Sequence, residues 1–351
     1  TIVTIVFGIV IIYSATHSYP NSSKYIIMQI FSAVIGFILV FLITLVDYRY
    51  FCQAYKIIYI FSILALAAVF LFGTGSKGWG AQRWIRIGGF GIQPSEAVKI
   101  GFIITLAKYL DLIKENINRV KYLCYLLAYV MIPVILVMKQ PDLGTALSFL
   151  FIFVVMVYTC NINYKYIIGA FLSVLVTFPI AWYLLLKPYQ KTRILVFLNP
   201  DLDSLNSGYH VIQSKIAVGS GGLFGSGLFK GVQTQLEYLP DKHTDFIFSV
   251  IGEELGFLGS IVVILLLLLI IYRCIMISKA TKNTLGSLIC VGVANMLLFQ
   301  TMQNIGMCIG LAPVTGIPLP FISYGGSSLI TNLIGIGFVL SVDLRRKYMN
   351  F

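Results

Sequence analysis

Apolar residues dominate long segments of this chain, and short polar stretches separate those segments. A helix needs about 20 mostly apolar residues to cross the hydrocarbon core of a bilayer. The pattern therefore predicts an all-α polytopic membrane protein with about ten transmembrane helices and a large extracytoplasmic loop between spans 7 and 8. The predicted spans are residues 1–16, 25–46, 56–72, 94–112, 122–138, 146–160, 166–185, 247–272, 285–309 and 327–343.

The composition agrees with this pattern, because 58% of the residues are hydrophobic. A mean hydropathy of +0.92 is typical of a chain that lies in a bilayer. It leaves no room for a sizeable soluble domain, so residues 1–351 are expected to form a single transmembrane domain. The six cysteines follow neither a disulfide pattern nor a metal-ligand spacing, and we expect buried or reduced thiols.

Positive charge is divided unevenly between the two sets of loops. Twelve Lys and Arg residues lie at one set of span ends, and five lie in the opposite short loops. Because cytoplasmic loops carry the excess of Lys and Arg, both termini are expected in the cytoplasm. The segments expected to face outward are 73–93, 139–145, 186–246 and 310–326. The sequence starts at Thr1, inside the first predicted span, so further residues are expected to precede it.

Segment 236–259 concentrates ionisable residues beside a very apolar run. Ionisable residues at a membrane span usually mark an ion path or a reaction site. Asp245 is the candidate catalytic acid, because it stands where a polar loop becomes the apolar sequence FIF. A partly desolvated carboxylate has a raised pKa and can act as a general base. Alternatively the acids of this segment, above all Glu253 and Glu254, cap the following helix and face solvent.

Segment 73–93 combines glycines with cationic and aromatic residues. Glycines allow tight turns, and tryptophans such as Trp79 and Trp84 suit a membrane interface. Lys77, Arg83 and Arg86 make the same segment cationic. We therefore expect a cationic loop at the outer surface of the membrane.

Three further ionisable residues stand at the start of predicted spans. Glu96 and Lys99 are three residues apart, so they share one face of the fourth span. A buried pair there is costly unless it serves a site or a tight polar network; alternatively, it lies at the interface and fixes the depth of the helix. Asp142 either belongs to the same site or caps the sixth span at its N-terminus.

The segment 186–246 is long for a loop without secondary structure, and such loops are usually functional or disordered. The cations near its start either bind a diphosphate or contact anionic lipid headgroups; they are Lys187, Lys191 and Arg193. Its middle, residues 213–231, predicts a short amphipathic helix on the membrane. The glycine run there fits no nucleotide-binding motif, so we interpret it as a bend.

These features predict a cavity that opens outward and carries a base and several cations. The Pro- and Gly-rich segment 310–328 is expected to line it. Polar residues of the ninth span either face this cavity or bond neighbouring helices: Asn295, Gln300, Gln303 and Asn304. A base beside cations suits transfer from a lipid pyrophosphate to a hydroxyl group. A transporter of the same lipid would need the cations but not the base, and composition does not separate the two.

Five motifs, in order along essentially the whole chain, resemble the SEDS family, whose members include RodA, FtsW and SpoVE. The motifs are GAQRWIRIGGFGIQPSE (80–96), QPDLGTA (140–146), GYHVIQSKIAVGSGGLFGSGL (208–228), LPDKHTDFIFSVIGEELGFLG (239–259) and NIGMCIGLAPVTGIPLPFISYGGSSL (304–329). The stretch 208–240 is more similar to the RodA branch than to the FtsW branch. The resemblance implies a peptidoglycan glycosyltransferase of the bacterial cell membrane. It would polymerise lipid II into β-1,4-linked glycan for cell elongation and rod shape, with release of undecaprenyl pyrophosphate.

The resemblance also implies roles for individual residues. Asp245 would be essential, as a general base or as the ligand of a divalent cation, Mg²⁺ or Mn²⁺, and Trp84 would be important. Roles in substrate binding are expected for Arg83, Glu96, Lys99, Asp142 and Arg193, with the neighbouring Lys191. The chain departs from the family pattern at Asp241, where Glu is usual, and at Ser226, where Lys is common and Lys230 could substitute.

The expected partners are lipid II, membrane lipids, a class B penicillin-binding protein that acts as the transpeptidase, and other proteins of the elongation complex. Neither a nucleotide nor a nucleic acid is expected. A flippase for the lipid-linked precursor is the main alternative, and it predicts that the purified protein makes no polymer. A scaffold without chemistry is a further alternative, and it predicts that Asp245→Asn has no effect.

Overall fold

The computed structural model describes residues 1–74, 83–87, 90–184, 186, 188–203 and 207–348, so the predictions for Lys77, Trp79 and Lys187 lie outside the described residues. The long helices are α1 (Ile2–Thr16), α2 (Ser22–Leu45), α4 (Tyr55–Phe72), α5 (Pro94–Ile113), α6 (Val120–Lys139), α7 (Leu143–Tyr158), α8 (Tyr164–Leu184), α12 (Ile247–Ala280), α13 (Thr284–Ile309) and α14 (Gly326–Tyr348). The shorter ones are α3 (Tyr48–Gln53), α9 (Pro188–Leu198), α10 (Ser207–Ser220) and α11 (Val232–Gln235), with 3₁₀ turns at Lys114–Asn116 and Pro200–Asp203.

The ten long helices of the described residues lie where the ten spans are predicted, with ends that differ by up to eight residues. Within the described part of the chain, six helices are long and apolar enough to cross a membrane: α2, α4, α6, α12, α13 and α14. Shorter apolar helices include α1, α7 and the first part of α8. The chain is therefore a multi-pass membrane protein.

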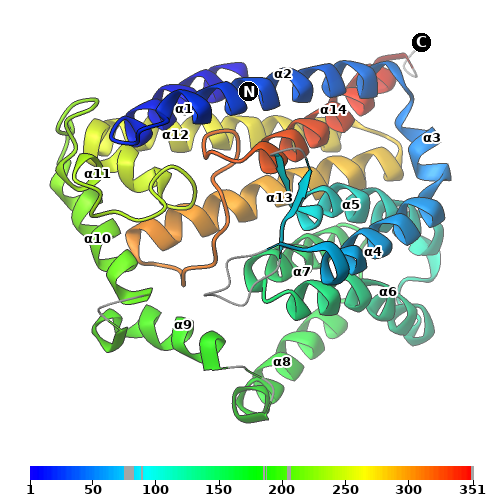
Figure 1. Cartoon of the computed structure of the whole chain (residues 1–351). Coiled ribbons are helices and arrows are strands. Elements are labelled where there is room, and N and C mark those ends of the chain that lie inside the picture. The colour runs from blue at the N-terminus through cyan, green and yellow to red at the C-terminus, as the bar shows by residue number, and fades with distance from the viewer. Residues whose placement is uncertain (75–82, 88–89, 185, 187, 204–206, 349–351) are drawn as a thin grey trace.

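Helix α13 forms the centre of the bundle. In its apolar window 72% of the residues are buried, against 22% in α2 and 17% in α4. It packs against α5, α7, α12 and α14, while α2 lies along α14 at the edge of the bundle (Figure 1). The exposed apolar faces of α2 and α4 suit contact with lipid chains. Polar residues are tolerated on α13, because its side chains are buried against other helices and not against lipid.

The predicted all-α fold gains one small β-hairpin. Strands β1 (Ile85–Ile87) and β2 (Phe90–Ile92) pair in antiparallel fashion, with Arg86 opposite Gly91. A further bridge joins Thr74 to Trp84. The sequence predicts a loop here, because each strand is only three residues long and gives no alternating pattern.

The prediction of a short amphipathic helix at residues 213–231 is wrong in its bounds. The helix α10 begins at Ser207 and ends at Ser220, and it packs against α12 and α13 (Figure 1). Ser214 is fully buried there, with its hydroxyl 2.6 Å from that of Ser249, and it donates a hydrogen bond to the carbonyl of Cys308. The apolar side of α10 therefore covers other helices.

The glycine run that follows α10 interrupts α12. Gly256 has φ 66° inside that helix, so α12 consists of two helical segments joined at this residue. The glycine loop supplies the missing hydrogen bonds, because the amide of Ser226 donates to the carbonyl of Glu253 at 2.9 Å and that of Phe257 donates to the carbonyl of Gly222 at 2.9 Å. The predicted bend is thus a glycine loop that is hydrogen-bonded, backbone to backbone, to the break in α12.

This junction predicts a strong preference for glycine at position 225. Gly225 has φ 79°, and a Cβ atom there would lie 2.2 Å from the carbonyl oxygen of Glu254. We expect Gly225→Ala to lower the free energy of unfolding by about 1–3 kcal/mol. Gly219→Ala is the matched control, since a Cβ there meets nothing within 4 Å and should leave stability equal or raised by about 0.5–1 kcal/mol. Thermal unfolding of the two purified variants tests this, and equal melting temperatures would contradict it.

Candidate functional site

Asp245 lies in the turn before α12, and its backbone is fixed by α13 and by the loop that follows α13. The carbonyl of Asp245 accepts a hydrogen bond from Asn304 Nδ2 at 2.8 Å. The carbonyl of the preceding Thr244 accepts from Ser323 Oγ at 2.6 Å, and the carbonyl of His243 accepts from the amide of Tyr324 at 2.9 Å. These contacts hold the HTD sequence against the 310–325 loop, as is required of a group that must meet a substrate at a defined place.

The carboxyl group of Asp245 faces that loop. A Cβ atom added at Gly316 would lie 3.3 Å from Asp245 Oδ2, and Gly316 has φ 73°. The Asp245 side chain is half-buried, so it keeps contact with solvent while losing much of its hydration. This burial, together with the nearby charge of Asp241, raises the pKa of Asp245 to about 7.

The charges around Asp245 come from segments far apart in the sequence. Arg83 and Arg193 lower its pKa, whereas Asp142 raises it slightly, and burial outweighs all of them. Arg83 precedes the hairpin and Arg193 lies on α9. The fold therefore gathers three predicted site residues around the candidate base, which sequence spacing alone could not show.

Asp142 fixes the position of Arg83 and caps a helix. Its carboxylate accepts hydrogen bonds from the amide of Thr145 at 3.2 Å and from Gln93 Nε2 at 3.1 Å, and it lies 3.8 Å from Arg83 Nη1. Arg83 also donates to the carbonyls of Gln140 and Pro141. The helix-cap alternative is thus correct for Asp142, and the same carboxylate pairs with the candidate substrate-binding arginine.

Glu96 and Lys99 form an ion pair within the bundle. Lys99 Nζ lies 2.7 Å from Glu96 Oε1, and the two residues are 1% and 4% exposed, respectively. The alternative of an interfacial pair that sets helix depth is therefore wrong. Pro94 and the N-cap Gln93 begin α5 next to the hairpin, so the pair enters the bundle interior within the first two turns.

The ion pair belongs to a polar level that crosses three helices. A Cβ atom at Gly335 would lie 3.3 Å from Ile100 and 3.5 Å from Met296. The helices α14, α5 and α13 therefore contact one another at these three residues. One turn closer to Asp245, the same helix faces carry Glu96, Gln300 and Asn332. Among the described atoms, Glu96 Oε2 and both side-chain amides lack a hydrogen-bond partner. Asn304, which donates to the carbonyl of Asp245, stands one further turn along α13, so Gln300 lies one helical turn further from Asp245 than Asn304 does.

The model of the FtsW/RodA/SpoVE family, described as cell cycle protein, matches residues 1–348. The chain belongs to this family. It is 40% identical over 299 residues to the peptidoglycan glycosyltransferase MrdB of Escherichia coli K12, covering 84% of this chain and 78% of that protein. It is 36% identical over 354 residues to the stage V sporulation protein E of Bacillus subtilis, covering 99% and 96%.

Solved structures show the same fold. A chain from a study titled "Structural coordination of polymerization and crosslinking by a peptidoglycan synthase complex" superposes with a TM-score of 0.83 at 33% identity, covering 98% of this chain and 97% of that one. The crystal structure of the rod shape determining protein RodA of Thermus thermophilus gives a TM-score of 0.71 at 28% identity, with 98% and 96% covered. The resemblance to the SEDS family is therefore confirmed.

Two other predicted residues of this FtsW/RodA/SpoVE family member lie less centrally. Trp84 is 40% exposed and stacks over Gly91 of the hairpin, where a Cβ atom would lie 3.2 Å from its ring. Lys191 is half-exposed on α9, two residues before Arg193. Among the described residues, no hydrogen bond or ion pair joins Trp84 or Lys191 to Asp245, so their roles stay predictions.

The acids at the start of α12 are structural, and the expectation that they face solvent is wrong. Glu253 accepts hydrogen bonds from the amides of Gln233 and Thr234, at 2.6 and 3.0 Å, and so caps α11. Glu254 accepts from Ser14 Oγ at 2.6 Å. Both are fully buried, because the glycine loop and α1 cover this part of α12.

Sequence reasoning missed the residues that position the site. Asn304 was considered only as a cavity or helix-bonding residue, while Ser323 and Gly316 were part of a segment described only by its prolines and glycines. A Gly and a Ser within a Pro-rich loop give no sign of which distant residue they contact. Within the described residues, no group of three or more His, Cys, Asp or Glu side chains is arranged to hold a metal ion.

Proposed function

We propose that this protein is a peptidoglycan glycosyltransferase that polymerises lipid II and releases undecaprenyl pyrophosphate. The observation that carries the proposal is the position of the Asp245 carboxyl. Its pKa is raised to about 7, and it lies close enough to Arg83 and Arg193 for their positive charges to act on it. Its similarity to a named peptidoglycan glycosyltransferase over 84% of the chain supports the same activity. The similarity of stretch 208–240 to RodA favours a role in cell elongation.

The proposed reaction uses Asp245 as a general base. Its carboxylate takes the proton of the acceptor sugar's 4-hydroxyl as that oxygen attacks the anomeric carbon of the donor. The bond from this carbon to the pyrophosphate breaks, and the α-linked donor becomes a β-linked product. Arg83 and Arg193 stabilise the negative charge on the departing pyrophosphate. A base with a pKa near the operating pH is best suited to this transfer.

A divalent cation, Mg²⁺ or Mn²⁺, fits this site only together with substrate. Mg²⁺ is often held by one or two carboxylates plus substrate phosphates, and Asp245 offers one half-buried carboxylate without a described ion-pair partner. When bound, the cation would neutralise charge on the pyrophosphate. Asp245 would then coordinate the cation, either while also acting as the general base or instead of acting as the general base.

The raised pKa of Asp245 predicts a pH dependence. The base form is the carboxylate, so polymerisation should rise with pH and reach half of its maximum near pH 7. The folded state binds this proton more tightly than the unfolded state, so Asp245 contributes stability at low pH that is lost as pH rises from about 4 to 7. Initial rates between pH 5 and 9 measure the first effect, and a flat profile would contradict it.

Arg83 is expected to contribute strongly to leaving-group stabilisation. Removing one such group typically lowers kcat by about 10²–10³-fold. We expect an effect of this size for Arg83→Gln, measured as the rate of glycan formation from lipid II. Arg86→Gln is the control, because Arg86 is an exposed cation on the neighbouring hairpin. A similar loss in both variants would show that general surface charge, not Arg83, matters.

We propose that both termini are cytoplasmic and that the Asp245 cluster faces outward, where the glycan is needed. The excess of Lys and Arg at one set of span ends supports this orientation. A class B penicillin-binding protein is the proposed transpeptidase partner, supported by the similarity to a chain of a peptidoglycan synthase complex. Other elongation-complex proteins are proposed from the family resemblance alone.

The test is polymerisation of labelled lipid II by purified protein in liposomes with a divalent cation, with and without the transpeptidase. Glycan chains from the wild type support the proposal. An absence of polymer under both conditions, with transfer of labelled lipid across the bilayer, would favour the flippase alternative. The names of the similar proteins favour the glycosyltransferase. The presence of a candidate base, Asp245, favours it as well, because transport of the lipid would not need a base.

A further inference from the structure

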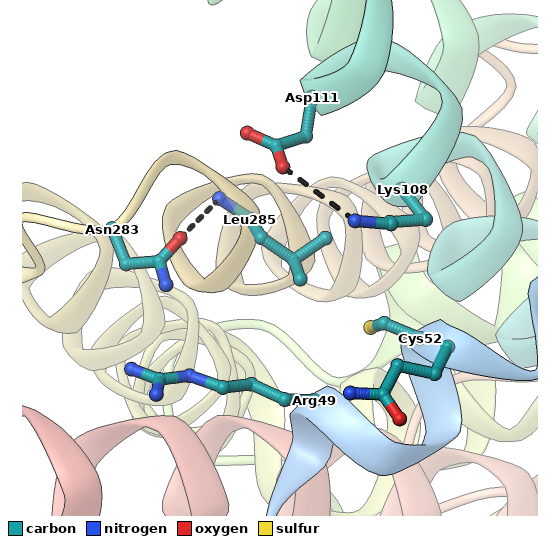
Figure 2. Close-up of a pocket in the computed structure, with 7 residues that line it drawn as sticks. Arg49, Cys52, Lys108, Asp111, Asn283 and Leu285 are labelled. Carbon is teal, nitrogen blue, oxygen red and sulfur yellow. Dashed lines mark hydrogen bonds and ion pairs between the residues drawn. The ribbon is translucent and has the colours of Figure 1, made fainter.

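A polar pocket lies at the end of the bundle opposite Asp245. Asp245 precedes α12, whereas the pocket includes Asn283 just beyond the other end of this helix, and the segment of α12 after Gly256 alone spans about 36 Å. The pocket has a volume of about 380 Å³ and lies between α3, the last turns of α5 and the start of α13 (Figure 2). Figure 1 places α3 at the opposite end of the molecule from α10 and α11.

Hydrogen-bond donors predominate in this pocket. Lys108 enters from α5 and Arg49 from α3, and Gln53 also lines the wall (Figure 2). The side-chain oxygen of Asn283 already accepts a hydrogen bond from the amide of Leu285 at 3.0 Å. Its NH₂ group therefore remains as the part of the amide that can serve a ligand.

The one acid in the pocket is neutralised by its neighbours. Asp111 lies 4.0 Å from Lys108 Nζ and 3.3 Å from Lys114 Nζ. Of the charged residues that line the pocket, Lys108 and Arg49 are cations and Asp111 is the one acid, so the lining carries a net positive charge. The N-terminus of α13, capped by Asn283, adds partial positive charge at the same place. A donor-rich cationic pocket is complementary to an anion that only accepts hydrogen bonds, such as a phosphate group.

An apolar surface adjoins the cations. Leu112 stands one turn after Lys108 on the same face of α5 and is 56% exposed. At the end of a membrane span, such a side chain suits contact with acyl chains. A ligand with a phosphate group in the pocket and an apolar part against Leu112 would satisfy both surfaces.

We propose that this pocket binds the phosphate group of an anionic ligand, at a site separate from the Asp245 cluster. Two sources share this chemistry: an anionic phospholipid such as phosphatidylglycerol, or a soluble phosphate compound. Cations at a membrane surface attract anionic lipids in general, whereas the donors grouped in this open pocket match the oxygen atoms of a phosphate group. The proposal does not depend on the glycosyltransferase activity.

The test uses native mass spectrometry of the full chain, stripped of lipid in detergent. Phosphatidylglycerol, diacylglycerol and glycerol phosphate are added in turn. We expect phosphatidylglycerol to remain bound while diacylglycerol does not, and we expect Gln53→Glu to weaken binding about tenfold through charge repulsion. Gln53 is exposed, so this variant should fold. Lys108→Gln should weaken binding similarly, whereas Lys121→Gln, an exposed cation of α6, should not.

The outcomes distinguish the sources and can overturn the proposal. Binding of phosphatidylglycerol that glycerol phosphate does not displace identifies a lipid site. Displacement by glycerol phosphate at equal concentration identifies a site for soluble phosphate compounds. Equal binding of diacylglycerol, or equal loss in Lys121→Gln and Gln53→Glu, would overturn the pocket as a phosphate site.

Discussion

Asp245→Asn should lower the rate of glycan polymerisation by about 10²–10⁴-fold, the usual contribution of a positioned general base. The amide is nearly the same size as the carboxyl, so the contacts that fix the backbone should persist. These are the hydrogen bonds to the carbonyls of Asp245 and Thr244 from Asn304 and Ser323. The loss should therefore appear in kcat, with a melting temperature equal to or above that of the wild type, because burial already disfavours the charged form.

Asp241→Asn is the matched control for this prediction. Asp241 is exposed and has φ 48°, a left-handed conformation that Asn adopts readily. Removing its charge should lower the pKa of Asp245, since Asp241 raises it. We expect activity to be kept, with the midpoint of the pH profile shifted to lower pH. Full activity of Asp245→Asn would remove Asp245 from the chemistry, and equal inactivity of both variants would point to damage of the turn.

Lys99→Met should lower the free energy of unfolding by about 3–5 kcal/mol, because it leaves the Glu96 carboxylate buried without its ion-pair partner. The second oxygen of Glu96 has no hydrogen-bond partner among the described atoms, so little would compensate for the loss. Combining Lys99→Met with Glu96→Gln should recover much of the stability, since both charges are then gone. Thermal unfolding in detergent measures all three proteins.

Lys114→Met provides the control for this pair. Lys114 also pairs with an acid three residues away, Asp111, but it is 45% exposed, and such pairs contribute about 0–1 kcal/mol. Equal decreases in the free energy of unfolding for Lys99→Met and Lys114→Met would contradict the prediction that burial makes the Glu96–Lys99 pair the more costly one to break. The double variant at positions 96 and 99 also tests the predicted role in substrate binding. If it is stable but has a raised KM or a lowered kcat, the pair acts on the reaction and not only on stability.

The sequence by itself determined the membrane-spanning architecture. A helix in a bilayer must satisfy its own backbone hydrogen bonds and needs about 20 apolar residues, so hydropathy alone marks each span. The motifs around Asp245 and the RodA-like stretch likewise identified the family before any contact was known. Asp245 was identified because a carboxylate beside an apolar run has a high free-energy cost of desolvation. Both the carboxylate and the apolar run lie within one short segment of the sequence.

Only the tertiary structure decided what each polar residue contacts. Glu253 and Glu254 have the same local pattern as a solvent-facing cap, but α1, α11 and the glycine loop bury them. Arg83, Asp142 and Arg193 approach Asp245 from separate segments, and local periodicity contains no information on such distances. The hairpin and the break at Gly256 depend on backbone pairing between segments, which no residue pattern specifies alone. A hydrogen bond or an ion pair forms between whichever groups the packed helices bring together, so these contacts are properties of the assembled bundle.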